Sequence, residues 1–155
     1  MNFGFGVGDI LTISKLAVTV YTAYKDAPND YKHIAQEVKS LQTMINKAAQ
    51  HFKSPTLTDN DRQEGQDVLT GCQSILKDLD SFITNYNSLA SPHTSQVHKK
   101  VMFSIEDTAP LRAKLISNTV LLSSFIRRFD ISMLPFSILA NTSILAVNSL
   151  KHKQN

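Results

Sequence analysis

The sequence predicts an all-α fold, an antiparallel bundle of four to five helices, and three observations support this prediction. Apolar residues recur at spacings of three and four along several segments, which is the period of one helical face. No stretch alternates apolar and polar residues as a half-buried strand does. The connections between the periodic segments are short, as between antiparallel neighbours in a bundle. At 155 residues the chain can bury a sizeable core, so we expect residues 1–155 to form a single domain.

The first predicted helix runs from about Asp9 to Lys25, with Asp9 as its N-cap and Pro28 as its far limit. One face of this helix carries an apolar stripe, which consists of Ile10, Ile13, Ala17, Val20 and Tyr24. Apolar residues that widen this stripe beyond an ordinary amphipathic face are Leu11, Leu16, Val18 and Tyr21. Residues 1–8 are interpreted as a flexible or anchoring N-terminal arm. Such a helix suits the centre of a bundle, or a segment that leaves the bundle for a membrane.

The second predicted helix begins at Asn29 or Asp30 and ends before Pro55, because proline cannot continue a helix. Its apolar residues alternate spacings of four and three over nearly three heptads. This seam consists of Ile34, Val38, Leu41, Ile45, Ala48 and Phe52. We expect it to face the core.

The third predicted helix begins near Thr58 or Asp59, with acidic residues in its first turn, where the helix dipole favours them. Its seam consists of Leu69, Cys72, Leu76, Leu79, Ile83 and Tyr86. Gly65 and Gly71 each cost about 1 kcal/mol in a helix interior. We therefore expect the early part of this helix to be less well formed.

The fourth segment is predicted as two pieces, a short helix over 97–105 and a longer one capped by Asp107 or Thr108, with Pro110 in its first turn. The seam of the longer piece consists of Leu111, Leu115, Leu122, Phe125 and Phe129, interrupted by Asn118. Residues 131–150 carry no charge, and we expect a final apolar helix packed on the bundle. A transmembrane helix is the alternative, which the scattered hydroxyls and amides disfavour.

No arrangement of residues is typical of catalysis, of a metal site or of a cofactor site. The lone cysteine, Cys72, excludes an internal disulfide and a multi-cysteine zinc site, and it favours a reducing cytoplasm. On a helix seam it is expected to be a buried, inert thiol. The sequence Gly4-x-Gly6-x-Gly8 lacks the preceding strand and the Gly-Lys-Ser/Thr ending of a phosphate-binding loop. We therefore expect no enzyme, no metal and no cofactor.

Charge is unevenly distributed along the chain. Residues 1–90 carry eight Lys/Arg and ten Asp/Glu, whereas residues 91–155 carry eight Lys/Arg and three Asp/Glu. The basic second half is compatible with an acidic lipid surface or partner, and equally with ordinary solvated helix faces. The basic residues are too sparse, and too little interleaved with aromatic residues, to predict nucleic-acid binding.

Three strings resemble a known family: FGFGVGDILTISKLA, YKDAPNDYKHIAQEVKSL and HKKVMFSIEDTAPLRAKLISNTVLLSSF. Together they resemble the N-terminal helical domains of fungal STAND proteins, relatives of NOD-like receptors, which are described as HeLo-like or SesA-like. The resemblance covers most of residues 1–128. Residues 99–105 would be the short basic-aromatic helix of that family. Its leucine-rich helix would contain Leu111, Leu115, Leu121 and Leu122.

The resemblance implies a non-enzymatic, cytoplasmic signalling or effector domain. A nucleotide-binding oligomerisation domain, in cis or in trans, would cluster several copies into a homo-oligomer. In the HeLo branch the output is regulated cell death in incompatibility or defence, through association of the first helix with a membrane, for which anionic lipids are the candidate partner. Residues expected in membrane contact or oligomerisation are Phe3, Phe5, Ile10, Leu11, Ile13, Leu16 and Val20. The alternative is an adaptor bundle that self-associates or binds a partner helix through the surface of the second and third helices.

Overall fold

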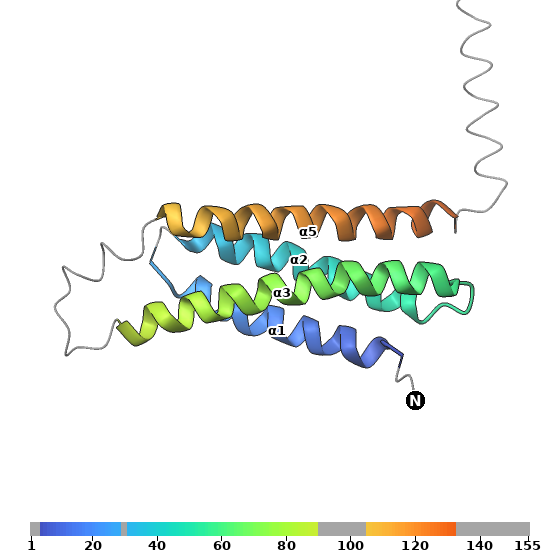
Figure 1. The fold of residues 1–155 in the computed structure, drawn as a ribbon, viewed down its shortest axis with the longest axis horizontal. Helices are drawn as coiled ribbons and strands as arrows, with labels where there is room; N and C mark the ends of the chain where they lie inside the picture. The colour runs from blue at the N-terminus through green and yellow to red at the C-terminus, as the bar shows by residue number, and fades with distance from the viewer. Residues whose placement is uncertain (1–3, 29–30, 90–104, 133–155) are drawn as a thin grey trace, which may run out of the picture.

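A computed structural model describes residues 4–28, 31–89 and 105–132, and these residues form an all-helical bundle, as predicted (Figure 1). The helices are α1 (Val7–Lys25), α2 (Lys32–Phe52), α3 (Asp59–Leu89) and α5 (Ile105–Ser132). Within these ranges no strand is present. Two predictions concern residues outside these ranges: nearly all of the short helix over 97–105, and most of the final helix over 131–150.

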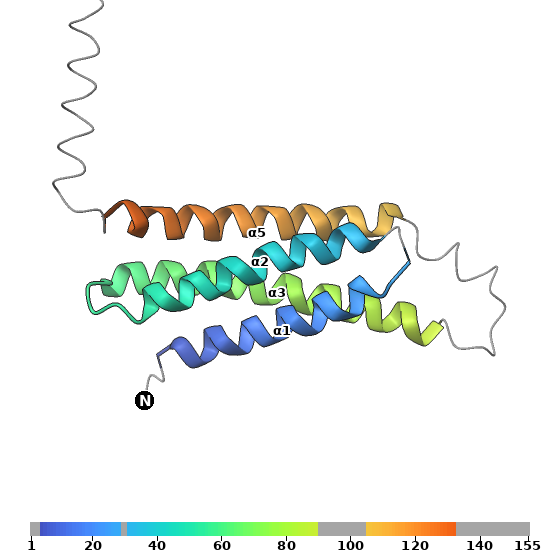
Figure 2. The same cartoon turned by 180° about the vertical axis from the view of Figure 1, so that it is seen from behind.

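The helices are ordered around the bundle as α1, α2, α5 and α3. α1 packs on α2 and α3, α5 packs on the same two helices, and α2 and α3 meet only sparsely. Figures 1 and 2 accordingly show α1 along one edge and α5 along the opposite edge. Successive helices among those described run in opposite directions, so α1 is parallel to α3 and α2 is parallel to α5. The outer sides of α1 and α5 thus belong to opposite edges of the bundle.

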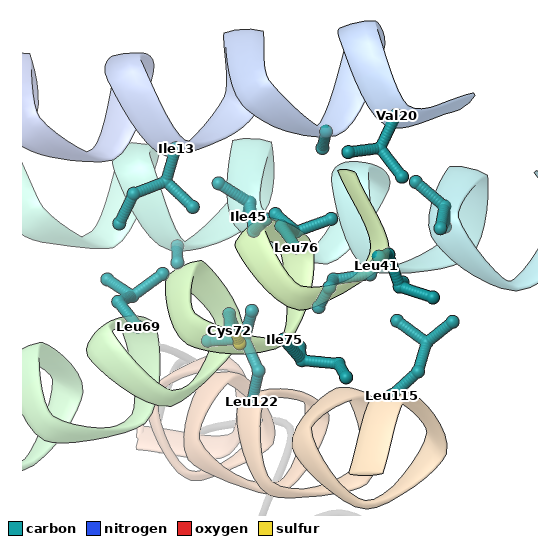
Figure 3. Packing of buried hydrophobic residues seen from close by; sticks show 14 of the residues in the cluster. Ile13, Val20, Leu41, Ile45, Leu69, Cys72, Ile75, Leu76, Leu115 and Leu122 are labelled. Atoms are coloured by element: carbon teal, nitrogen blue, oxygen red, sulfur yellow. The ribbon is translucent and has the colours of Figure 1, made fainter. Parts of the chain in front are cut away.

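The core lies between all four described helices and consists of the predicted seams (Figure 3). Ile13 and Val20 of α1 point toward Ile45 and Leu76, and Leu115 closes the cluster from α5. Predicted seam residues that are buried are Ile34, Val38, Leu41, Ile45, Leu69, Leu76, Leu79, Ile83, Leu115, Leu122 and Phe125. Leu111 is half-buried and packs against this cluster.

The N-terminus of α1 differs from the prediction, because Gly6 is the N-cap and Asp9 lies within the first turn. The Gly6 N–H donates a hydrogen bond of 2.7 Å to Oδ2 of Asp9. The carboxylate therefore stabilises the helix start from the third helical position, where it also faces the positive end of the helix dipole. Glycine is an acceptable N-cap, so the helix can start before its acidic residue.

The N-termini of α2 and α3 are capped in different ways. The prediction that Asn29 or Asp30 caps α2 is wrong, because the N-cap is Tyr31. The Tyr31 side chain makes no cap hydrogen bond and packs its ring edge-on against Phe82 and Tyr86, at centroid distances of 6.1 and 5.6 Å. α3 starts at Asp59 as predicted. Thr58 and Asp61 cap it reciprocally: the Asp61 N–H donates to Thr58 Oγ1 at 3.1 Å, and the Thr58 N–H donates to Asp61 Oδ2 at 3.3 Å.

The predicted start of α5 at Asp107 or Thr108 is wrong. The helix begins at Ile105, so both residues lie inside it and Pro110 falls in its second turn. A proline there removes one backbone hydrogen bond, and near a helix end the helix continues in spite of that loss. Thr108 is completely buried, so it belongs to the bundle interior rather than to a solvent-exposed cap.

The predicted weakness of early α3 is also wrong, because α3 is continuous through Gly65 and Gly71. A Cβ atom on Gly65 would lie 2.6 Å from Cζ of Phe125 and 2.7 Å from Cζ of Phe52. Gly65 therefore lets two aromatic rings of the neighbouring helices approach the α3 backbone. The packing that it permits offsets its low helix propensity.

We expect Gly65→Ala to lower the free energy of unfolding by about 1–3 kcal/mol, because Phe52 and Phe125 are buried and must shift. Gly71→Ala is the matched control in the same helix. Its Cβ would meet only the end of the Asn118 side chain, with Oδ1 at 2.5 Å, and that group can rotate away. Urea denaturation followed by circular dichroism measures both variants. A loss at Gly71 equal to that at Gly65 would contradict this assignment of the close contact.

Candidate interaction surfaces

The inner face of α1 is part of the core. Ile10, Ile13 and Val20, three of the residues predicted to contact a membrane, are at most 1% exposed. Tyr24 is also buried, and its hydroxyl donates a hydrogen bond of 2.9 Å to the carbonyl oxygen of Leu79 in α3. These residues can reach a membrane or a second copy only when α1 leaves the bundle.

The N-terminal arm is attached to the core through Phe5. This residue is half-buried, and its ring lies edge-on to Phe52 at a centroid distance of 6.0 Å. Phe52 in turn contacts Phe125 at 6.4 Å, so the arm extends an aromatic cluster at one end of the bundle. Phe3 lies outside the described residues.

The outer face of α1 is exposed and weakly polar. Leu11 is 49% exposed and Val18 is 45% exposed, whereas Leu16 is half-buried against the core. The only charged residue between Asp9 and Lys25 is Lys15. The sequence suggested a helix suited to the centre of a bundle, whereas within the described residues α1 leaves this outer face exposed.

Threonine hydroxyls on this outer face are satisfied within α1 itself. Thr12, Thr19 and Thr22 each donate to the carbonyl oxygen four residues earlier, at 3.0, 3.2 and 2.9 Å. A hydroxyl bonded to its own helix does not need water as an acceptor, and its methyl group is left on the surface. The outer face of α1 is thus less polar than its composition indicates.

A second exposed apolar surface lies on α5, and the sequence interpretation missed it. Ile116, Val120 and Leu121 are 48%, 57% and 52% exposed. We define the α5 outer surface by these three residues and the small exposed residues around them: Ala113, Ile116, Ser117, Val120, Leu121 and Ser124. The signal was present in the sequence, since 111–129 carries apolar residues on both sides of its seam, but only the seam itself was assigned.

Basic residues of α5 are partly neutralised by acidic residues from the first half of the chain. The Arg112 guanidinium binds the Glu37 carboxylate of α2 in a bidentate arrangement, with Nε and Oε2 at 3.2 Å. This hydrogen bonding raises the pKa of Arg112. Arg128 pairs with Glu64 of α3 at 2.7 Å. Two basic residues of α5 thus form ion pairs with acidic residues of α2 and α3.

Cys72 is completely buried, and burial raises the pKa of its thiol to about 12, so it is the inert core thiol that was predicted. Across residues 4–28, 31–89 and 105–132, no group of three or more His, Cys, Asp or Glu is placed to hold a metal ion. In the same ranges no helix combines the length and apolar character that crossing a bilayer requires.

No family model matches the chain, and no curated protein and no solved structure matches it either. The candidate surfaces are therefore interpreted from their own geometry.

Proposed function

We propose that this chain is a non-enzymatic signalling domain of NOD-like receptor type, which oligomerises and delivers α1 to an anionic membrane to trigger regulated cell death. The family in this proposal comes from the three sequence strings. The observation that best supports its membrane part is α1 itself. Its inner face is apolar except for Ser14, which donates a hydrogen bond to Asn46, and the Tyr24 hydroxyl, and its outer face is weakly polar. An ordinary bundle helix would carry charged residues on its outer side.

Released α1 would suit the membrane interface rather than a span. Its 19 residues would lie along the headgroup boundary with the apolar side inward, as amphipathic helices do. Lys15 can extend its ammonium group toward water while its methylene chain stays in the apolar layer. The internally bonded threonines lower the cost of placing the opposite face among the lipid headgroups.

Release of α1 requires a trigger. Burying one large aliphatic side chain contributes about 1.5–3 kcal/mol, so the inner face of α1 contributes on the order of 10 kcal/mol to the resting bundle. In a monomer in water, this contribution keeps α1 packed in the bundle. Clustering of several copies by a nucleotide-binding partner, together with burial of α1 in lipid, would have to offset it.

The alternative is an adaptor that self-associates or binds a partner helix without touching a membrane. It was expected to use the surface of α2 and α3. Exposed residues along the described part of these helices are polar or charged, including Lys39, Thr43, Asn46 and Lys47 on α2 and Asp67, Thr70, Ser74 and Lys77 on α3. Such faces offer a partner helix no apolar stripe to pack against. The weakly polar outer face is found on α1 instead, which favours the membrane proposal over an adaptor that uses α2 and α3.

The membrane proposal is tested by dye release from vesicles that contain an anionic lipid, with the chain clustered by a fused trimeric coiled coil. We expect release by the unsubstituted chain and at least a tenfold reduction by the double variant Leu11→Glu, Val18→Glu. Both positions are exposed, so the bundle stays folded while the outer face of α1 becomes charged.

The matched control is Thr43→Glu, which places a carboxylate on the exposed side of α2 and is expected to leave release unchanged. If clustered, unsubstituted chains leave the vesicles intact, the membrane part of the proposal fails. Light scattering over a range of concentrations would then decide whether the chain self-associates as an adaptor.

A further inference from the structure

Hydrogen bonds between side chains of α1 and its neighbours lie in the middle of the helix and at its C-terminal end. The Tyr24 hydroxyl donates to the carbonyl oxygen of Leu79 in α3 at 2.9 Å. About three turns earlier, the Ser14 hydroxyl donates to Oδ1 of Asn46 in α2 at 2.7 Å. Residues 7–13 of α1 precede both hydrogen bonds. An opening that starts at this end therefore meets neither of them for about two turns.

The N-terminal end of α1 is held by the aromatic ring of Phe5. This ring is half-buried and lies edge-on to Phe52 of α2 at a centroid distance of 6.0 Å, a favourable arrangement of two aromatic rings. Gly6, the next residue, is the N-cap of α1, so a movement of Phe5 passes directly to the first helical turn. Val7 adds a smaller apolar contact with the core. Among residues 4–9, Phe5 is thus the largest side chain that holds α1 on the bundle.

The site that receives this ring is built by the other three described helices. Arg62 of α3 donates from Nη1 to the carbonyl oxygen of Phe52 at 3.1 Å, at the C-terminal end of α2. Gly65 of α3 lets Phe52 and Phe125 of α5 lie close to the α3 backbone, with their rings 6.4 Å apart. We define Phe52, Gly65 and Phe125 as the seat. Contacts with α3 and α5 position Phe52, so a change in the packing of those helices reaches the start of α1.

We propose that Phe5 is an autoinhibitory latch, which keeps the N-terminal end of α1 on the bundle and lets α1 open from that end when it leaves the seat. An opening from the other end would first break the hydrogen bond of the Tyr24 hydroxyl. This inference rests on the proposed function, because a latch on α1 has a consequence only if α1 leaves the bundle. Phe5 was expected to contact a membrane, and its ring becomes available to lipid when the latch opens.

Amide hydrogen exchange of the full chain, followed by NMR at low urea concentrations, tests the order of opening. After correction for intrinsic rates, we expect the amides at 11–14 to exchange at least tenfold faster than those at 72–79 of α3, with a weaker dependence on urea. Phe5→Ala is expected to raise the exchange at 11–14 at least fivefold further. Tyr24→Phe is the matched control. It is expected to raise the exchange at 72–79 and to leave 11–14 unchanged, because Tyr24 stays bound while the N-terminal end opens.

Two results would overturn the latch. Exchange at 11–14 that matches 72–79 in rate and in urea dependence would mean that α1 opens only when the whole bundle unfolds. Exchange at 11–14 that Phe5→Ala leaves unchanged would mean that Phe5 does not control the opening. If Phe5→Ala is unfolded by circular dichroism, Phe5→Val replaces it, with an expected increase of at least twofold.

Dye release from anionic vesicles separates the latch from the proposed function. Gly65→Ala displaces Phe52 from its position and leaves Phe5 itself unchanged, so we expect clustered Gly65→Ala to release dye at least threefold faster than clustered Gly71→Ala. Equal release by these two variants would overturn the autoinhibitory role of the seat. If neither variant nor the unsubstituted chain releases dye, the membrane part of the proposed function fails, and the exchange at 11–14 alone decides whether Phe5 controls the opening of α1.

Discussion

Replacing Ile13 by aspartate is expected to lower the free energy of unfolding by about 4 kcal/mol or more, whereas Leu11→Asp, two residues earlier in α1, is expected to lower it by less than about 1 kcal/mol. Ile13 is 1% exposed and Leu11 is 49% exposed. The first substitution removes a buried aliphatic side chain and places a carboxyl group among apolar neighbours without a partner. The second replaces a side chain that already contacts water.

The two variants are well matched. They lie in one helix and change a large aliphatic residue into the same acid, so differences in helix propensity are small. Since the chain has no tryptophan, circular dichroism at 222 nm during urea denaturation is the suitable measurement. Equal losses at the two positions would contradict the placement of α1, because they would mean that its two faces are buried alike.

The difference between Ile13 and Leu11 could not be predicted from the sequence. Ile13 and Leu11 are both apolar, and α1 is apolar on more than one side, so periodicity alone left the width of its buried face open. In α2 the polar residues between Val38, Leu41 and Ile45 removed that ambiguity, and these seam residues are completely buried as predicted. A helix with one apolar stripe can be oriented from its sequence, whereas a helix with two cannot.

Which helices lie next to each other could not be predicted from the sequence, for a different reason. A seam shows which face is buried but not which helix it contacts, so the order α1, α2, α5, α3 could not be derived. The same limit explains the error at Gly65. Its low helix propensity is a local property, but its effect depends on Phe52 and Phe125, which are distant in sequence and adjacent in the bundle.

The residues predicted to contact a membrane differ in burial: Leu11 is exposed, whereas Ile10, Ile13 and Val20 belong to the core. Their contact with a membrane stays a prediction. The α5 outer surface was missed because only the core-facing seam of residues 111–129 was assigned, and the apolar residues outside that seam were not considered. A search for apolar residues left over after each seam is assigned would have found Ile116 and Val120.

Alkaline pH is expected to destabilise the bundle strongly, starting near pH 9. Burial raises the pKa of the Cys72 thiol from about 9 to about 12. Below pH 9 both the folded and the unfolded chain keep this proton, so stability does not depend on it. Between pH 9 and pH 12 the unfolded chain loses the proton while the folded chain retains it, which favours unfolding by up to roughly 1.4 kcal/mol per pH unit.

The buried phenol of Tyr24 acts in the same direction. Burial raises its pKa above the ordinary value of 10, and neighbouring Tyr31 and Asp80 add to the shift. From about pH 10 upward, ionisation of this tyrosine in the unfolded chain therefore adds a second driving force for unfolding. Together the two groups predict a loss on the order of several kcal/mol by pH 12, which is a large fraction of the stability of a single domain.

Urea midpoints measured from pH 7 to pH 12 test this expectation. Cys72→Ala is expected to make the decline shallower from pH 9, and Tyr24→Phe from pH 10, because each variant removes a group that titrates only on unfolding. The double variant is expected to show the flattest profile. Lysine deprotonation affects all four proteins alike, so the difference between the profiles isolates the two buried groups. A decline that neither substitution changes would mean that water reaches Cys72 and Tyr24, and with them the centre of the core that holds α1 in place.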